Sequence, residues 1–264
     1  MIQATPLTNA SPLSHEDHVA GRFGAQAAAY VASATHAQGE DLADLANLAG
    51  TRPGGAALDL GCGGGHVAYA VAPGLGSVTA YDLSEDMLAA VAAEAGRRGL
   101  TNIATRRGSV EALPFADAAF DLVLTRFSAH HWGRVPAALA EARRVLRPDG
   151  RLAIIDVVAP EDPLLDTHLQ AWELLRDPSH GRDYRVSEWR AMLGEAGFRV
   201  GRTVARRLPL AFPAWIARMG TPEADAAAIR RLQASAPEPV RRHFAVEPDG
   251  SFTVDTATIE AEPA

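Results

Sequence analysis

The sequence predicts an α/β fold: a doubly wound, mostly parallel seven-stranded sheet with N-terminal helices and a helical insertion between the last two strands. Short apolar runs alternate with amphipathic stretches from residue 56 to residue 158, which is typical of a parallel sheet covered by helices on both faces. A glycine-rich turn follows the first apolar run, and an aspartate ends the second. Two later strand-like segments enclose a helical stretch, so we expect the end of the chain to complete the sheet.

The elements of the predicted core follow one another at short intervals. Strands are expected at 56–60, 77–81, 102–105, 120–125 and 151–158, and helices are expected to begin at His66, Ser84 and Pro136. The helix at Ser84 carries the clearest signals. Ser84 can cap it, acidic residues occupy its first turn, and Gly99 follows its basic end. The third helix is expected to run to about Leu146, where the turn at 147–150 ends it.

Helices are expected to dominate both ends of the chain. The predicted helices there lie near 17–32, 37–49, 165–175, 187–196 and 213–244, and the two late strands lie at 198–208 and 251–259. These elements predict one continuous domain with a helical cap (1–50), a ligand-binding core (51–160) and a completion of the sheet with a helical lid (161–264). The apolar, aromatic segment 209–220 can form a substrate lid, core or a dimer face, which leaves a homodimer open.

The composition is that of a soluble globular protein. Of 264 residues, 47% are hydrophobic and 22% are charged, and no apolar stretch is long enough for a membrane helix. The N-terminal stretch lacks the basic and apolar regions of a secretory signal, and Cys62 has no second cysteine to pair with. These features predict a cytoplasmic protein.

The charge pattern excludes several functions. The formal net charge is −7 and no basic patch is visible, so we expect no nucleic-acid partner. The sequence contains no lysine, and its 25 basic residues are therefore arginines. This excludes a P-loop lysine and a Schiff-base lysine.

The strongest functional signal is the segment Leu58–Gly65, in which a buried strand carries an acid and then turns through closely spaced glycines. Glycines allow a tight turn and bring backbone N–H groups close to a ligand. Asp82 ends the second strand, where a carboxylate can face the same crevice and accept hydrogen bonds from ribose hydroxyls. A strand–turn–helix without a ligand is the alternative, and the position of Asp82 weighs against it.

A dinucleotide fingerprint fits this segment poorly. Counted from Gly61, the third position of the G-x-G-x-x-G/A pattern is His66, which fails it. Counted from Gly63, Ala68 satisfies the pattern, but that register leaves Asp59 without a role. An NAD-dependent oxidoreductase is therefore the weaker alternative.

Four segments in order resemble the motifs of class I S-adenosylmethionine-dependent methyltransferases, in the UbiE-like branch that contains quinone-biosynthesis C-methyltransferases. The segments are Asp59–Gly65, Tyr81–Leu88, Glu111–Phe115 with Phe120–Val123, and Val145–Leu152. Phe23–Gln26 and Tyr30, together with Ser128–Trp132, further resemble a bacterial subgroup of unassigned substrate. The resemblance implies a Rossmann-like fold, S-adenosylmethionine as cofactor, S-adenosylhomocysteine as product and methylation of a small molecule.

The resemblance also implies roles for individual residues. The methionine moiety would lie against Asp59 and the glycine backbone, the ribose against Asp82, and the adenine between Leu83 and Met87 with the loop 109–111 at its edge. Arg126 and Phe127 would approach the methionine side. The implied cofactor residues are Asp59, Gly61, Cys62, Gly63, Gly65, Asp82, Leu83, Met87, Ser109, Val110, Glu111, Arg126 and Phe127.

One position departs from the pattern. Many relatives carry an aspartate where Ser109 stands, and that carboxylate accepts a hydrogen bond from the adenine amino group. A serine hydroxyl can still accept, but without charge the bond is weaker. We therefore expect Asp82 to matter more for cofactor binding than Ser109.

The catalytic candidates are His130, His131 and Tyr30. A histidine titrates near neutral pH and can remove a proton from the acceptor, although His130 and His131 can equally shape the pocket. Tyr30 lies on the N-terminal helix that closes over the cofactor in similar enzymes. No spacing of histidine, cysteine and acidic residues completes a metal site, so no metal is expected.

The sequence thus predicts methylation of carbon or oxygen in a small, apolar or aromatic acceptor. A non-catalytic S-adenosylmethionine-binding protein is the first alternative, and the oxidoreductase is the second.

Overall fold

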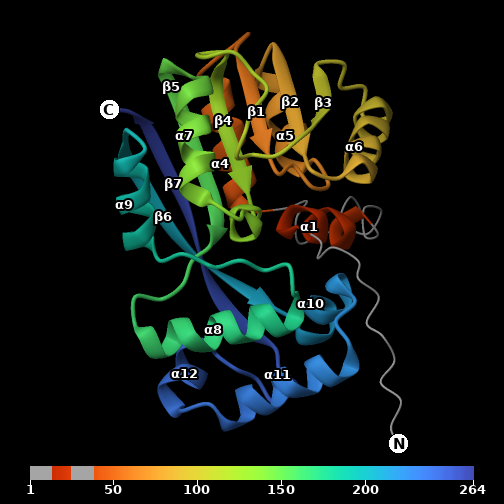
Figure 1. Ribbon diagram of the computed structural model, residues 1–264, viewed down its shortest axis with the longest axis vertical. Coiled ribbons are helices and arrows are strands. Elements are labelled where there is room, and N and C mark those ends of the chain that lie inside the picture. The colour runs from red at the N-terminus through yellow and green to blue at the C-terminus, as the bar shows by residue number, and fades with distance from the viewer. Residues whose placement is uncertain (1–13, 25–38) are drawn as a thin grey trace, which may run out of the picture.

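The computed structural model describes residues 14–24 and 39–264 (Figure 1). Its seven-stranded sheet has the order β3-β2-β1-β4-β5-β7-β6. The strands are β1 (Ala56–Leu60), β2 (Ser77–Asp82), β3 (Ile103–Arg107), β4 (Phe120–Arg126), β5 (Leu146–Val157), β6 (Phe198–Leu210) and β7 (Phe252–Pro263). Strands β1 to β5 pair in parallel, whereas β7 runs antiparallel to both β5 and β6. The predicted doubly wound, Rossmann-like sheet is confirmed.

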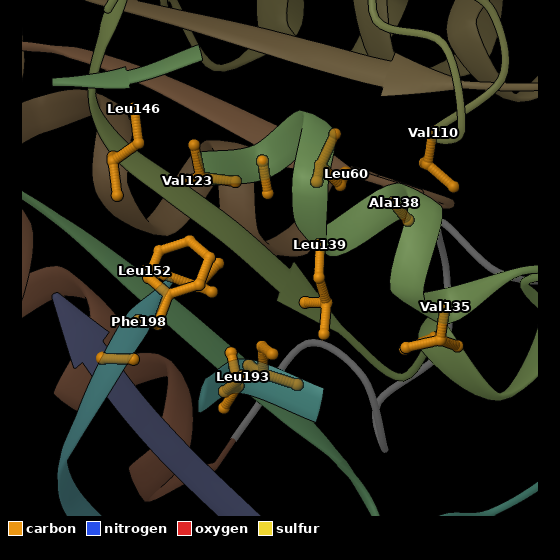
Figure 2. Close-up of a cluster of buried hydrophobic side chains, with 14 of the residues drawn as sticks. Leu60, Val110, Val123, Val135, Ala138, Leu139, Leu146, Leu152, Leu193 and Phe198 are labelled. Atoms are coloured by element: carbon orange, nitrogen blue, oxygen red, sulfur yellow. The ribbon is translucent and has the colours of Figure 1, made fainter. Parts of the chain in front are cut away.

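Helices cover both faces of the sheet. One face packs against α4 (Glu40–Gly50), α5 (His66–Val71), the short 3-10 helix η1 (Ala72–Gly74) and α6 (Glu85–Arg97). The other face packs against α7 (Val135–Val145) and α9 (Val186–Glu195), and Figure 2 shows the buried side chains between these helices and the strands. Successive side chains of β1 alternate between the two faces, so Leu58 joins one core cluster and Ala57 the other.

Burial explains why the sequence signal of β4 is strong and that of β3 is weak. The first six residues of β4 are buried because helices cover it on both sides, and its sequence is a nearly continuous apolar run. Strand β3 lies at the edge of the sheet, is mostly exposed and ends in two arginines, which matches its weak sequence signal.

Strand β5 begins earlier than predicted. The turn expected at 147–150 is part of the strand, which starts directly after α7. Leu146 is buried and pairs with Phe120, and the register then shifts between Phe120 and Leu122. This irregularity accommodates residues 147–150 within the strand.

The helical insertion between β6 and β7 forms, together with α8 (Pro163–Arg176), a second body of packed helices around the ends of these two strands (Figure 1). The insertion comprises α10 (Phe212–Met219), α11 (Glu223–Ser235) and α12 (Glu238–His243), whereas α8 lies between β5 and β6 in the chain. Trp172 is fully buried at the centre of this second body, with its ring 5.0 Å from that of Phe244. The segment 209–220 contributes to this core, because Phe212 and Trp215 of α10 are buried in the same cluster.

Helix α1 (His15–Gly24) lies across the sheet edge at which the parallel strands end, between the core and the insertion (Figure 1). The Nε2 atom of His15 is 2.9 Å from the backbone oxygen of His131. Arg22 donates a hydrogen bond to the backbone oxygen of Met219 in α10 (3.1 Å) and lies 3.6 Å from the carboxylate of Asp177. The helix therefore ties the two bodies together. No helix in residues 14–24 and 39–264 is long and apolar enough to cross a membrane.

Candidate active site

A pocket of about 980 Å³, open to solvent, lies where β1, β2 and β4 end. Its lining comes from five stretches: α1, the glycine turn after β1, the end of β2, the loop after β3 and the loop after β4. The lining residues are Glu16, Val19, Ala20, Phe23, Asp59, Gly61, Cys62, Gly63, Gly64, His66, Val67, Asp82, Leu83, Gly108, Val110, Glu111, Arg126, Phe127, Ser128, His131, Trp132 and Gly133.

The glycine turn and Asp82 meet in this pocket, as the motifs require. The backbone N–H of Gly63 donates a hydrogen bond to Oδ2 of Asp82 (2.9 Å), and the N–H of Ser84 donates to its Oδ1 (2.9 Å). Backbone donors thus fix the carboxylate, which lines the pocket and keeps lone pairs for further hydrogen bonds. Gly61 has φ +65°, and a Cβ there would lie 1.8 Å from the hydroxyl of Ser128, so the position requires glycine.

Asp59 lines the pocket and has an unsatisfied carboxylate oxygen. Its Oδ2 accepts a hydrogen bond from the N–H of Ala68 (3.2 Å), whereas Oδ1 is buried and has no hydrogen-bond partner among the described residues. Burial raises the pKa of Asp59 to about 7; the bond from Ala68 opposes this rise, and the charge of Asp82 adds to it. A buried orphan oxygen is costly, and a cationic ligand group in the pocket would satisfy it. The residues therefore fit the amino group and sulfonium of S-adenosylmethionine.

The inner face of α1 closes the pocket, and its residues were not among the predicted site residues. Glu16, Val19, Ala20 and Phe23 are spaced as one side of a helix and all line the cavity. The hydroxyl of Ser109 donates to Oε1 of Glu16. Helical periodicity at 16, 19, 20 and 23 could have revealed this face, and the resemblance already implied that an N-terminal helix closes over the cofactor.

Most predicted cofactor residues gather in the pocket. Asp59, Gly61, Cys62, Gly63, Asp82, Leu83, Val110, Glu111, Arg126 and Phe127 line it. Arg126 is held by Asp41 of α4, whose Oδ2 accepts its Nε–H at 2.5 Å. The lining leaves out Gly65, Met87 and Ser109.

Those three residues lie just behind the pocket wall. Gly65 caps α5 with φ +79° and packs against Tyr69. Met87 is fully buried in α6, and the hydroxyl of Ser109 is bonded to Glu16 and to the N–H of Glu111. Tyr30 lies outside the described residues.

A second pocket of about 590 Å³ adjoins the first, between the sheet edge and the helical insertion. Phe23, Phe127 and His131 line both pockets. The remaining lining residues are His130, Val157, Glu173, Arg176, Asp183, Leu208, Leu210, Trp215 and Arg218. The sequence predicted two parts of this pocket, the histidine candidates in η2 (Ala129–His131) and the possible lid segment 209–220, which contains α10. The other walls come from the end of β5, α8 and β6, and no local pattern places these elements together.

The two histidine candidates differ in environment. Nδ1 of His130 lies 2.6 Å from Oδ1 of Asp156. Burial alone would lower the pKa of His130, but the charge of Asp156 and its hydrogen bond, with Asp183 and Glu173, raise it to about 9.

His131 is the uncharged member of the pair. Its Nδ1 lies 3.0 Å from the backbone oxygen of Ser179, which fixes the ring by a hydrogen bond. Burial and the neighbouring charge of His130 lower the pKa of His131 to about 3, against the opposing charge of Asp177. The ring packs edge-on against Phe23 at 4.8 Å between centroids. His131 therefore separates the two pockets as a neutral aromatic wall.

Comparison with known proteins identifies the family. A methyltransferase domain model matches residues 58–154. The chain is 48% identical to YafE of Escherichia coli over 76% of this chain and 97% of YafE. It is 36% identical to the uncharacterized methyltransferase YcgJ of Bacillus subtilis over 76% of this chain and 79% of YcgJ. It also shares 41% identity over 43% of its length, and 47% of the relative's, with the ubiquinone/menaquinone biosynthesis C-methyltransferase UbiE of Paracoccus denitrificans.

Solved structures show the same fold. The crystal structure of YcgJ from Bacillus subtilis has a TM-score of 0.82 at 32% identity, covering 85% of this chain and 99% of YcgJ. A protein from Bacillus halodurans gives 0.81 at 33% identity, covering 86% and 100%. With the glycine turn, Asp59 and Asp82 gathered in one pocket, these relatives show that the chain belongs to the class I S-adenosylmethionine-dependent methyltransferases, in the UbiE-like branch.

Proposed function

We propose that this methyltransferase acts on carbon or oxygen of a small, apolar or aromatic acceptor that binds in the second pocket. The observation that carries the proposal is the shared wall, because Phe23, Phe127 and His131 line both pockets. Methyl transfer requires the acceptor to lie directly beside the cofactor. The aromatic and aliphatic side chains of Phe127, Leu208 and Trp215 support an apolar acceptor.

The first pocket would hold the cofactor along its length. Asp59 and the glycine turn would hold the methionine end, Asp82 the ribose hydroxyls, and Leu83 with Val110 the adenine. When bound, S-adenosylmethionine supplies a methyl group made electrophilic by its positively charged sulfur. The chain's own residues orient this group and exclude water.

Glu16 would supply the carboxylate that position 109 lacks. It reaches Ser109 from α1 and lines the pocket beside Val110. In this proposal Glu16 accepts a hydrogen bond from the adenine amino group in place of the aspartate found in many relatives. Cofactor binding would then also fix α1 over the pocket.

The position and backbone conformation of Phe127 support the proposal that the methyl group is transferred where the two pockets meet. Its backbone has φ +51°, a conformation that bulky residues rarely adopt. The N–H of Phe127 donates to the backbone oxygen of Ile155 (2.8 Å), which helps to hold the strained backbone in place. Such strain at a position lining both cavities fits a residue that separates cofactor and acceptor.

The test combines cofactor binding with turnover. The protein is titrated with S-adenosylmethionine and with NAD in a calorimeter, and then incubated with S-adenosylmethionine and a bacterial metabolite extract while S-adenosylhomocysteine is measured. We expect binding of S-adenosylmethionine but not of NAD, and release of S-adenosylhomocysteine that depends on the extract. Cofactor binding without release by any extract fraction would favour the non-catalytic alternative.

Three wider expectations stay predictions. A cytoplasmic location is predicted from the composition, because Cys62 has no second cysteine to pair with. The net charge of −7 argues against a nucleic-acid partner. A homodimer is testable by light scattering.

A further inference from the structure

We infer that Asp41 of α4 positions the guanidinium of Arg126, and that Arg126 binds the α-carboxylate on the methionine group of S-adenosylmethionine. The inference concerns the cofactor and is independent of the acceptor. It rests on the proposed function in one respect, because it takes the methionine end of the cofactor to lie beside Asp59. It adds a residue outside the pocket, Asp41, to those that the reaction requires.

Arg126 lies on the same face of the sheet as Asp59 and closer to the ends of the strands. In the parallel pair of β1 and β4, Asp59 is the partner of Leu124, and Arg126 follows Leu124 by two residues. Side chains two residues apart in a strand point to the same face. Both charged side chains therefore point toward α4 and α5, and both line the cofactor pocket. An ammonium and a carboxylate bonded to one carbon atom can meet these two side chains together.

The charges of the cofactor pocket require a cation at this end. The described lining holds four carboxylates and a single arginine, Arg126; the carboxylates are those of Glu16, Asp59, Asp82 and Glu111. The cofactor's methionine group carries an ammonium and a carboxylate, and the acidic side chains would repel that carboxylate unless a cation faces it. A guanidinium matches a carboxylate in shape, because its planar N–H fork can donate two parallel hydrogen bonds.

Arg126 and Asp59 already influence one another in the structure. Burial raises the pKa of Asp59 to about 7, and the positive charge of Arg126 opposes this rise. The side chain of Arg126 is 5% exposed, so solvent screens the interaction little. A zwitterion bound between the two side chains would place its ammonium at Asp59 and its carboxylate at Arg126, so that opposite charges adjoin throughout.

Asp41 fixes the guanidinium through a buried ion pair. Its Oδ2 accepts the Nε–H of Arg126 at 2.5 Å, and the guanidinium carbon lies 4.5 Å from the ring centre of Phe127. Asp41 occupies the first turn of α4, where the helix dipole favours a negative charge. Gly39 leaves room for the pair, because a Cβ there would lie 2.1 Å from Oδ1 of Asp41. A guanidinium has five N–H donors, so the bond to Asp41 orients it without exhausting its capacity to bind a ligand.

An ion pair that only ties α4 to the sheet is the alternative. Helix α4 already packs on the sheet through Leu42, Leu45 and Ala49. A buried ion pair adds little net stability, because both groups lose their hydration. A purely structural pair would also not need to lie in the pocket wall, where Arg126 lies. These observations favour a cofactor-binding role for Arg126 and a positioning role for Asp41.

The experiment compares S-adenosylhomocysteine with its decarboxylated analogue, which keeps the amino group and lacks the carboxylate. The full-length protein is titrated with each compound in a calorimeter. We expect the unmodified protein to prefer S-adenosylhomocysteine about tenfold to a hundredfold, as expected for hydrogen bonds between charged groups. Arg126→Gln should bind the two compounds about equally, and its affinity for the analogue should match that of the unmodified protein.

The role of Asp41 is tested by comparing two substitutions. Asp41→Ala should reduce the preference about fivefold or more, because Arg126 loses the acceptor that orients it. Asp41→Asn should keep most of the preference, because the amide oxygen can still accept the Nε–H. Asp44→Ala is the matched control: Asp44 lies on the same helix and pairs with Arg206, but neither residue lines the pocket. The preference should be unchanged in this control.

Equal affinities of the unmodified protein for the two compounds would overturn the inference, as would an Arg126→Gln protein that keeps the preference. If Arg126→Gln loses affinity for both compounds alike, the pair is structural and the inference is wrong. Equal losses in Asp41→Ala and Asp41→Asn would overturn the positioning role of Asp41. Binding of neither compound by the unmodified protein would overturn the proposed function as well.

Discussion

The two pockets meet at three residues but are built in different ways. In the cofactor pocket, backbone N–H groups fix the carboxylates, as Gly63 and Ser84 do for Asp82. In the second pocket, the carboxylate of Asp156 holds the ring of His130, and backbone N–H groups of Ala129 and His130 hold that carboxylate in turn. The first arrangement is built within one strand–turn–helix stretch, whereas the second joins the end of β5 to the loop after β4, and the rest of its pocket comes from more distant elements. Substitutions should therefore affect the two pockets separately.

The largest effect is expected from a substitution in the core of the second body of helices. Trp172→Ala removes a fully buried ring that packs against Phe244 and Phe252, and should lower the free energy of unfolding by about 3–5 kcal/mol. Urea denaturation measures the loss. Leu174→Ala on the same helix is the control, because its side chain is 54% exposed and should cost below about 0.5 kcal/mol. Similar losses for both variants would contradict the packing described for this body.

The next largest effect is expected from substitutions in the cofactor pocket. Asp82→Ala should weaken S-adenosylhomocysteine binding on the order of a hundredfold, because two hydrogen bonds to a charged group are lost and two backbone donors lose their acceptor. Ser109→Ala removes one neutral hydroxyl and should cost only a few-fold. Calorimetry compares the two variants. Comparable losses would show that the adenine edge contributes as much to binding as the ribose carboxylate, and would contradict the prediction.

The same contrast explains what the sequence could predict. The cofactor pocket was predicted because a strand, a glycine turn and Asp82 lie within one βαβ stretch, where a parallel sheet dictates that strand ends meet. The second pocket joins Phe23, Asp183 and Leu208, residues far apart in the chain, and no local pattern encodes their meeting. The sequence does not single out Asp183, because the charged run Arg182–Arg185 is typical of a solvated loop. Its burial depends on contacts with Gln170 of α8, whose Oε1 accepts its N–H at 3.1 Å.

A smaller effect follows from the protonation of Asp59. Because its pKa is about 7 without a ligand, the carboxyl is largely protonated at pH 5.5, and a cationic ligand group must displace the proton. Affinity for S-adenosylhomocysteine should therefore rise about tenfold to twentyfold between pH 5.5 and pH 7, with release of a proton at the lower pH. Calorimetry in two buffers of different ionisation enthalpy measures both quantities. Asp59→Asn should bind with little dependence on pH over this range, and an equally steep dependence in that variant would assign the titration to another group.

The smallest effect concerns the edge of the cofactor pocket. If Glu16 accepts from the adenine amino group, Glu16→Ala should weaken S-adenosylhomocysteine binding about threefold to tenfold. It should also abolish the preference for S-adenosylhomocysteine over S-inosylhomocysteine, which carries an oxygen in place of that amino group. Ser109→Asp in the Glu16→Ala background should restore the preference, because the carboxylate then comes from the loop after β3. Asp17→Ala, at an exposed position of the same helix, should leave the preference intact. If the double variant discriminates no better than Glu16→Ala, the helix does not replace the loop carboxylate, and the adenine is recognised through backbone groups near Val110.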